Sequence, residues 1–241
     1  MHEIANEHML ENILSDNEDL AKHNQQHFDE LNLWTVNIMS APGAGKTSLL
    51  EATLLAVKDQ YQCGVIEGDM VGELDKLRLS KMGVSVWQIC TGRSCHLDAK
   101  MVAGLLHTEK LANLDILFVE NVGNLVCPAE FPLGEHKRVV LLSVTEGDDK
   151  PIKYPVIFRN CDCVIITKTD LLAYVDFKID KAVSNIRALN ANAKIFTLSV
   201  TTGEGMPDWL NWLKSELKHY WQSNKAMVKL QGKANVSVST S

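Results

Sequence analysis

Short apolar runs alternate with longer stretches of helical periodicity from about residue 33 onward. Seven runs predict strands, at Trp34–Met39, Gly64–Ile66, Val84–Ile89, Ile116–Val119, Val139–Val144, Val164–Thr167 and Ile195–Leu198. Helices are expected to begin near Lys46, Glu73, Leu97, Asp180 and Pro207. Strands that alternate with helices are typical of βα units, so the pattern predicts an α/β fold with a mostly parallel sheet flanked by helices.

The two ends of the chain differ from this pattern. Residues 1–31 are polar and acidic, and their apolar positions are spaced as on an irregular amphipathic helix, which predicts an N-terminal helical arm. Residues 227–241 end in a Ser/Thr/Val segment and are expected to form a disordered tail. A single folded domain is therefore predicted over residues 32–226.

Composition narrows the class of protein. The 241 residues are 46% hydrophobic and 22% charged, with a net charge of −6. A full hydrophobic core is therefore expected, and an intrinsically disordered protein is excluded as a class. A mildly acidic chain has little field to attract nucleic acid or anionic lipid, so neither is expected as a partner. No signal-peptide pattern or membrane-length apolar run is found, so a cytoplasmic location is expected and the six cysteines are interpreted as thiols or metal ligands.

A phosphate-binding loop follows the first predicted strand. Residues 40–48 read SAPGAGKTS, which matches the pattern G-x-x-x-x-G-K-[ST] except that Ser40 replaces the first glycine. Such a loop turns its backbone N–H groups toward the β- and γ-phosphates, with the lysine beside them and the Ser/Thr hydroxyl on Mg²⁺. The residues expected to contact nucleotide are Gly43, Ala44, Gly45, Lys46, Thr47 and Ser48.

A second motif indicates which base is bound. Residues 167–170 read TKTD and resemble the Asn-Lys-x-Asp motif of GTPases, so Lys168 and Asp170 are expected to contact guanine. The Asp170 carboxylate would accept hydrogen bonds from N1–H and the exocyclic amine, a donor pair that adenine lacks. Ser199 and Val200, after the next strand, are expected in a further base-contacting loop. Thr167 replaces the usual Asn, which leaves the strength of guanine selectivity open.

Carboxylates follow two of the predicted strands. Asp69 and Glu120 are expected to hold Mg²⁺ together with Thr47, or to position an attacking water. Gly123 ends an acidic-x-x-Gly pattern whose amide would sense the γ-phosphate. Asp75 is a candidate for a mobile switch residue, with an ordinary surface carboxylate as the alternative. The candidate catalytic residues are Lys46, Asp75 and Glu120.

Two segments carry soft metal ligands. Cys95 and His96 are expected to open a helix, where the dipole favours the thiolate, and Cys127 follows Glu120 by seven residues. No Cys-x-x-Cys pair is present, so a closed four-cysteine zinc site is not expected. Two chains meeting at a two-fold axis would be able to share metal between these thiolates. Buried or inert thiols are the alternative.

Together these segments resemble the HypB family, the nickel-insertion GTPases of [NiFe]-hydrogenase maturation. The matching segments are residues 40–48, 66–69, 91–99, 120–129 and 145–150, within a stretch from about Leu33 to Trp221. The resemblance implies a dimerising P-loop GTPase domain of the SIMIBI class over residues 32–226. Cys127-Pro128 is followed by Ala129, whereas the related urease nickel GTPases carry Cys-Pro-His.

The resemblance also implies a function. Cys95, His96 and Cys127 would bind nickel or zinc at a subunit interface, and GTP hydrolysis would change metal affinity. The partners implied are a second copy of the chain, a HypA-type metallochaperone and a hydrogenase large-subunit precursor. No N-terminal Cys-x-x-Cys-x-Cys motif is present, so tight nickel storage is not expected.

Two other classes remain open at this stage. One is a P-loop enzyme, a ligase or kinase, whose cysteines are structural and whose nucleotide consumption depends on a substrate. The other is a non-catalytic metal-storage protein, whose metal affinity would be indifferent to nucleotide.

Overall fold

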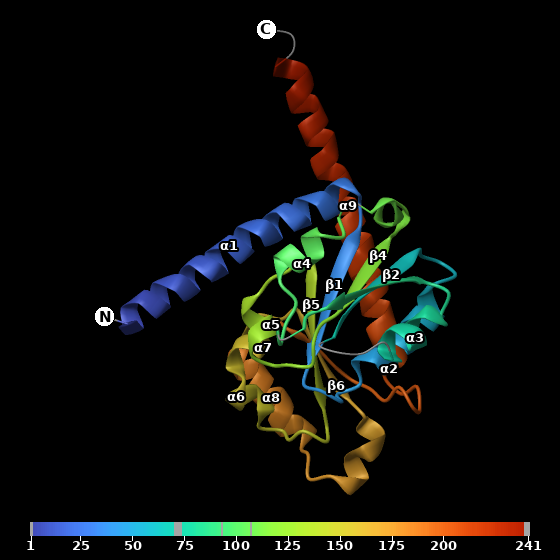
Figure 1. The fold of residues 1–241 in the computed structure, drawn as a ribbon. Coiled ribbons are helices and arrows are strands. Elements are labelled where there is room, and N and C mark those ends of the chain that lie inside the picture. The colour runs from blue at the N-terminus through green and yellow to red at the C-terminus, as the bar shows by residue number, and fades with distance from the viewer. Residues whose placement is uncertain (1, 70–73, 93, 107, 239–241) are drawn as a thin grey trace.

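The centre of the molecule is a sheet of seven parallel strands in the order β3-β2-β4-β1-β5-β6-β7. Figure 1 shows the computed structural model, which describes residues 2–69, 74–92, 94–106 and 108–238. The strands are β1 (Trp34–Ser40), β2 (Cys63–Asp69), β3 (Ser85–Cys90), β4 (Ile116–Glu120), β5 (Lys137–Ser143), β6 (Cys163–Thr167) and β7 (Lys194–Thr197). The predicted parallel sheet is confirmed.

Helices cover both faces of the sheet. They are α1 (His2–Glu30), α2 (Lys46–Val57), α3 (Leu74–Ser80), α4 (Ala99–Ala103), α5 (Cys127–Glu130), α6 (Lys150–Lys153), α7 (Pro155–Arg159), α8 (Ile179–Leu189) and α9 (Met206–Val238), with 3-10 turns at Glu109–Asn113 and Thr169–Tyr174. The strands β1, β4 and β6 are buried along their whole length, and β4 and β6 are apolar except at their last residue. The strand β1 also buries three polar side chains, those of Thr35, Asn37 and Ser40.

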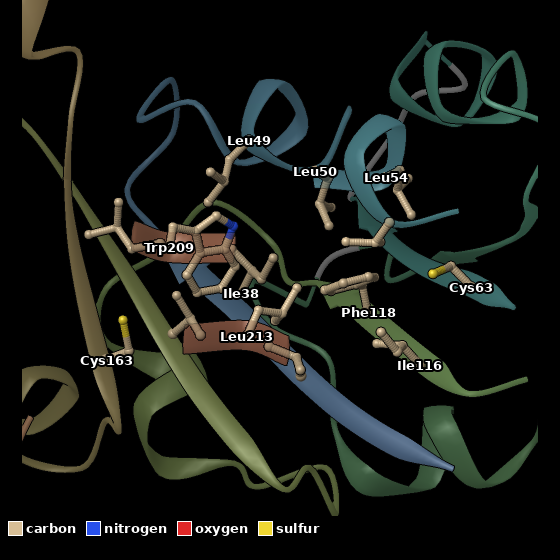
Figure 2. Close-up of a cluster of buried hydrophobic side chains, with 14 of the residues drawn as sticks. Ile38, Leu49, Leu50, Leu54, Cys63, Ile116, Phe118, Cys163, Trp209 and Leu213 are labelled. Atoms are coloured by element: carbon tan, nitrogen blue, oxygen red, sulfur yellow. The ribbon is translucent and has the colours of Figure 1, made fainter. Parts of the chain in front are cut away.

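One face of the sheet is packed by α2 and α9. Figure 2 shows Leu50 and Leu54 of α2 with Trp209 and Leu213 of α9 in a cluster of buried hydrophobic side chains. The Trp209 indole N–H donates a hydrogen bond of 2.9 Å to the Thr53 hydroxyl, which satisfies the one polar atom of that side chain. The helical stripe that begins at Trp209 is therefore part of the main core.

The predicted N-terminal arm is a helix, and its N-terminal end extends away from the sheet (Figure 1). Its second half packs on α4. Asn24, fully buried, donates hydrogen bonds to the carbonyls of Ala99 (2.8 Å) and Leu133 (2.9 Å). Phe28 is buried in the adjoining apolar cluster. The arm is thus anchored by its C-terminal half.

Two expectations about helix ends differ from the structure. The helix expected near Leu97 begins at Ala99, because the Asp98 carboxylate caps it by accepting a 2.8 Å hydrogen bond from the Met101 N–H. In place of a disordered tail from residue 227, α9 continues as a helix to Val238, and residues 239–241 lie outside the described part. About half of this segment consists of good helix formers, Met, Lys, Leu, Gln and Ala.

Among the described residues, no helix combines the length and apolar character that crossing a membrane requires. The carboxyl ends of β1, β2, β4 and β6 meet at one edge of the sheet. The chain leaves β1 toward β2 on one side of the sheet and leaves the adjacent strand β5 toward β6 on the other side. The carboxyl ends of β1 and β5 therefore form a topological switch point, where ligands bind in open α/β sheets.

Candidate nucleotide and metal sites

The phosphate loop joins the end of β1 to the start of α2. Gly43 (φ +74°) and Gly45 (φ +101°) adopt left-handed backbone conformations that residues with a side chain rarely take, and Gly45 caps α2. The Lys46 ammonium donates a 3.1 Å hydrogen bond to the Ser40 hydroxyl. The loop therefore presents backbone N–H groups and a cation at the N-terminus of a 12-residue helix.

The loop borders a cavity of about 520 Å³. Its lining brings together residues that the sequence predicted separately: Gly43, Gly45, Lys46, Thr47, Ser48, Asp69, Glu120, Gly123 and Lys168. Gly123 lies so close to the loop that an added Cβ would be 3.0 Å from Pro42 Cα. The acidic strand ends, the switch glycine and the phosphate loop thus form one site.

The oxygen donors of the cavity suit a magnesium ion. The Thr47 hydroxyl donates a 2.7 Å hydrogen bond to Glu120 Oε1, and both side chains are buried. Asp69 ends the neighbouring strand β2 and lines the same cavity. Hydroxyl and carboxylate oxygens are the ligands that Mg²⁺ prefers, so the residues present fit that ion.

Arg78 is a cavity residue that the sequence analysis did not single out. It extends from α3, where it forms a 2.6 Å ion pair with Glu51 of α2. An arginine on a short helix belongs to no motif, so only the packing of α3 against α2 brings it to the cavity. Asp75, the predicted switch residue, also belongs to α3, but its side chain lies outside the described residues.

The base motif is tied to the phosphate loop. The Thr167 hydroxyl donates a 2.8 Å hydrogen bond to the Ala44 carbonyl, and the Lys168 ammonium donates one of 2.6 Å to the Gly43 carbonyl. Lys168 has a left-handed backbone (φ +61°), which turns the chain from β6 toward the loop. A threonine thus anchors the motif where GTPases usually carry Asn.

Asp170 is oriented by the other predicted base loop. The Ser199 hydroxyl donates a 2.5 Å hydrogen bond to Asp170 Oδ1, and the Ser199 hydroxyl also accepts one from the Thr202 N–H. Val200 packs against the hydrophobic cluster that contains Leu198. The Ser199 hydrogen bond places the second predicted base loop beside Asp170. Contact of Asp170, Ser199 and Val200 with a base stays a prediction.

The three predicted soft ligands lie together within one chain. The Cys95 and Cys127 sulfurs are 2.9 Å apart, and the Cys95 sulfur is 3.9 Å from His96 Nδ1. One ligand atom from each of the three residues lies within 4.8 Å of the other two. The sequence left open whether two chains were needed to bring Cys95 and Cys127 together, and the fold of one chain does so.

The expectation that Cys95 and His96 open a helix is wrong. Cys127 is the first residue of α5, whereas Cys95 precedes the capped start of α4. Burial lowers the pKa of His96, an effect that the Asp98 carboxylate opposes, so the imidazole is held toward its neutral, metal-binding form. A hydrogen bond with Cys95 raises the pKa of the Cys127 thiol.

The remaining cysteines do not join this cluster. Cys63, Cys161 and Cys163 are buried, and burial raises the pKa of the Cys63 thiol to about 12 and that of Cys161 also to about 12. Cys90 is exposed at the end of β3. Two thiols and one imidazole are one donor fewer than a closed tetrahedral zinc site uses.

The parallel sheet, the phosphate loop after β1 and the acidic strand end beside it define a P-loop nucleotide-binding protein. The model of the CobW/HypB/UreG nucleotide-binding domain matches residues 34–197. The chain belongs to this family and, within it, to the HypB hydrogenase maturation factors, which confirms the resemblance seen in the sequence.

Several relatives are similar over most of their length. The chain is 45% identical over 204 residues to the hydrogenase maturation factor HypB of Escherichia coli K12, covering 85% of this chain and 70% of that protein. It is 38% identical over 218 residues to the probable HypB of Methanocaldococcus jannaschii, covering 90% and 99%.

Solved structures show the same fold. HypB from Archaeoglobus fulgidus matches with a TM-score of 0.80 at 39% identity, covering 84% of this chain and 99% of that chain. HypB from Helicobacter pylori, solved in complex with nickel, matches with a TM-score of 0.80 at 38% identity, covering 86% and 97%.

Proposed function

We propose that the protein is a GTP-hydrolysing metallochaperone that delivers nickel during [NiFe]-hydrogenase maturation. The observation that carries the proposal is the position of the soft-ligand cluster relative to the nucleotide cavity. Glu120, at the start of one short loop, lines the cavity, and Cys127, at its end, lies 2.9 Å from Cys95. Two comparisons support the same assignment: the relatives are named hydrogenase maturation factors, and the Helicobacter pylori protein was solved in complex with nickel.

The nucleotide half of the proposal assigns roles to residues of the cavity. Lys46 and the backbone N–H groups of the loop bind the β- and γ-phosphates, while Asp170 selects guanine. Thr47, Glu120 and Asp69 would hold Mg²⁺, which when bound neutralises charge that develops on the phosphates. Glu120 accepts the Thr47 hydrogen bond and so orients that hydroxyl toward the cavity.

The metal half uses the soft-ligand cluster. Cys95, His96 and Cys127 bind Ni²⁺ as cargo, since thiolate and imidazole suit nickel and zinc. A γ-phosphate that engages the Gly123 amide shifts the loop leading to Cys127, and metal affinity changes with nucleotide state. The proposal includes a homodimer, a HypA-type metallochaperone and a hydrogenase large-subunit precursor as partners, and a cytoplasmic location.

The test is a calorimetric titration of Ni²⁺ into the full chain loaded with GDP or, separately, with a non-hydrolysable GTP analogue. Light scattering reports the oligomer in each state. We expect different nickel affinity or stoichiometry in the two states, together with dimerisation in one of them. Phosphate release from GTP, followed in parallel, is expected to proceed slowly without any added substrate.

Other outcomes favour the other classes. Identical titrations in both states with negligible GTP turnover would indicate a metal-storage protein. Identical weak titrations with turnover that depends on an added small molecule would indicate a P-loop ligase or kinase with structural cysteines.

A further inference from the structure

The loop between Glu120 and Cys127 carries two asparagines, and their contacts differ. Asn121 is 1% exposed and follows the residue that binds the Thr47 hydroxyl. Asn124 is only half-buried and lies close to the cysteine cluster. The two side chains therefore offer two routes by which this loop contacts the metal ligands.

The Asn121 side chain joins three segments of the chain. Its Oδ1 accepts hydrogen bonds from the Val122 N–H at 2.9 Å and from the Leu97 N–H at 3.3 Å. Its Nδ2 donates a 3.3 Å hydrogen bond to Asn37 Oδ1 of β1, and its backbone N–H donates to the Ile38 carbonyl at 3.0 Å. Asn121 thus fixes the residue after His96 to the strand that leads into the phosphate loop.

Leu97 is held from the other side as well. Its side chain is fully buried and lies over Gly68, where an added Cβ would come within 2.7 Å of it. Gly68 precedes Asp69 at the end of β2, and both line the nucleotide cavity. Because interiors are close-packed, Leu97 cannot move without a matching shift at these strand ends.

Asn124 makes contacts of shorter range. Its Nδ2 donates a 3.2 Å hydrogen bond to the Cys95 carbonyl, and its Oδ1 accepts one of 2.9 Å from the Val126 N–H. Both partners belong to the segments that carry the cysteines. Asn124 therefore closes the metal loop on itself, because these hydrogen bonds stay within the segments that carry Cys95 and Cys127.

We propose that Asn121 is the positioning residue that transmits nucleotide state to the metal ligands, through its hydrogen bond to the Leu97 N–H. The inference rests on the proposed function and deepens it. A displacement of residues 120–123 by the γ-phosphate moves the Asn121 amide, and the amide carries the Cys95–Leu97 segment with it. Asn124 sets the intrinsic shape of the metal loop in either nucleotide state.

The test compares Ni²⁺ affinity with saturating GDP and with a saturating non-hydrolysable GTP analogue in the full chain. The ratio of the two dissociation constants measures the coupling, which for linked sites is typically about 5- to 150-fold. We expect Asn121→Ala to bring this ratio close to one. We expect Asn124→Ala to weaken nickel binding in both states equally and to keep the wild-type ratio.

A conservative variant separates positioning from general damage. Asn121→Asp keeps an oxygen that can accept from the Leu97 N–H, and we expect it to retain a larger part of the ratio than Asn121→Ala. If Asn121→Ala does not fold, Asn121→Asp becomes the informative variant. Asn121→Asp loses only the N–H donor that bonds to Asn37, so the coupling should be retained. Coupling abolished in Asn121→Asp, with circular dichroism unchanged, would contradict the role of Oδ1.

The outcomes distinguish the two proposals. A wild-type ratio of one overturns the nucleotide-gated function and this inference with it. A wild-type ratio above one that persists in Asn121→Ala, or that Asn124→Ala abolishes instead, overturns this inference and leaves the proposed function intact.

Discussion

The Thr47 hydroxyl donates a 2.7 Å hydrogen bond to Glu120 Oε1, and this contact joins the first turn of α2 to the end of β4. Thr47 is 8% exposed and Glu120 is 4% exposed, so water competes little for the bond. A residue of the phosphate loop and a residue of the loop that leads to Cys127 are thereby in direct contact. In the proposed function, this contact lies between the phosphates and the metal-binding loop.

Thr47→Ala is expected to slow GTP hydrolysis by about 100-fold or more, because it removes a hydroxyl that the metal–nucleotide complex needs. Thr47→Ser keeps the hydroxyl and is expected to stay within a few-fold of the wild type. The measurement is phosphate release at several Mg²⁺ concentrations. Equal rates for the alanine and serine variants would show that hydrolysis does not need the Thr47 hydroxyl.

Thr167→Val is expected to destabilise the protein by about 1–3 kcal/mol, because the Ala44 carbonyl loses a buried hydrogen-bond donor. Affinity for GDP should fall in the same variant, since Ala44 belongs to the phosphate loop. Urea unfolding and a fluorescent-GDP titration measure the two effects. Thr167→Ser, which retains the hydroxyl, is the matched control, and a valine variant as stable as the serine variant would refute the anchoring role.

Asp170→Asn is expected to weaken GDP binding by about tenfold or more, because a charged hydrogen-bond acceptor contributes about 1.5–3 kcal/mol. The same variant should gain affinity for xanthosine diphosphate, which presents an acceptor where guanine presents its amine. Competition titrations with the two nucleotides measure the exchange. If adenosine diphosphate competes as well as GDP in the wild type, the guanine assignment is wrong.

Cys127→Ala is expected to lower nickel affinity by more than about tenfold, because losing only a hydrogen bond that supports a metal ligand already lowers metal affinity by about that factor. The absorption bands of a nickel–thiolate complex should disappear while GTP binding stays. Cys90→Ala is the control, because Cys90 is an exposed cysteine at the end of β3 and outside the cluster. An unchanged nickel stoichiometry in Cys127→Ala would refute its assignment as a ligand.

Alkaline pH is expected to destabilise the fold through its buried thiols. Burial raises the pKa of Cys63 from its ordinary value of 9.0 to about 12, so between these values the unfolded chain has lost a proton that the folded chain keeps. The free energy of unfolding therefore falls with rising pH from about 9, by up to about 1.4 kcal/mol per pH unit for each such thiol.

Urea titrations at several pH values between about 8.5 and 10.5 measure this slope. Cys63→Ala is expected to show a shallower decline than the wild type. Parallel declines in the two proteins would show that the Cys63 thiol does not cause the effect.

Most of the fold was predictable because its signals are local. The strands β4 and β6 are short apolar runs, and the phosphate loop is a contiguous motif between a strand and a helix. The short helices α5, α6 and α7 have four or five residues, too few for a helical period to show in the sequence. The start of α4 was placed too early because the side chain of Asp98 decides it.

The site was only partly predictable. Motifs predicted Lys46, Thr47 and Asp170, and residue type together with the resemblance to a family predicted the three soft ligands. Arg78 belongs to no motif, and Asn121 occupies a variable position of the acidic-x-x-Gly pattern. Their proposed importance comes from neighbours distant in the sequence. The domain boundaries at residues 31 and 226 remain predictions.

By itself, the sequence determined the alternation of strands and helices, the phosphate loop and the base motif, because hydrophobic period and short contiguous motifs act within a few residues. Tertiary structure alone decided that Cys95 meets Cys127, that Thr167 bonds Ala44, and that Asn121 holds Leu97. These pairs are 24 to 123 residues apart along the chain. Their distances follow from the order of strands in the sheet and from close packing at its carboxyl edge, which no local pattern records.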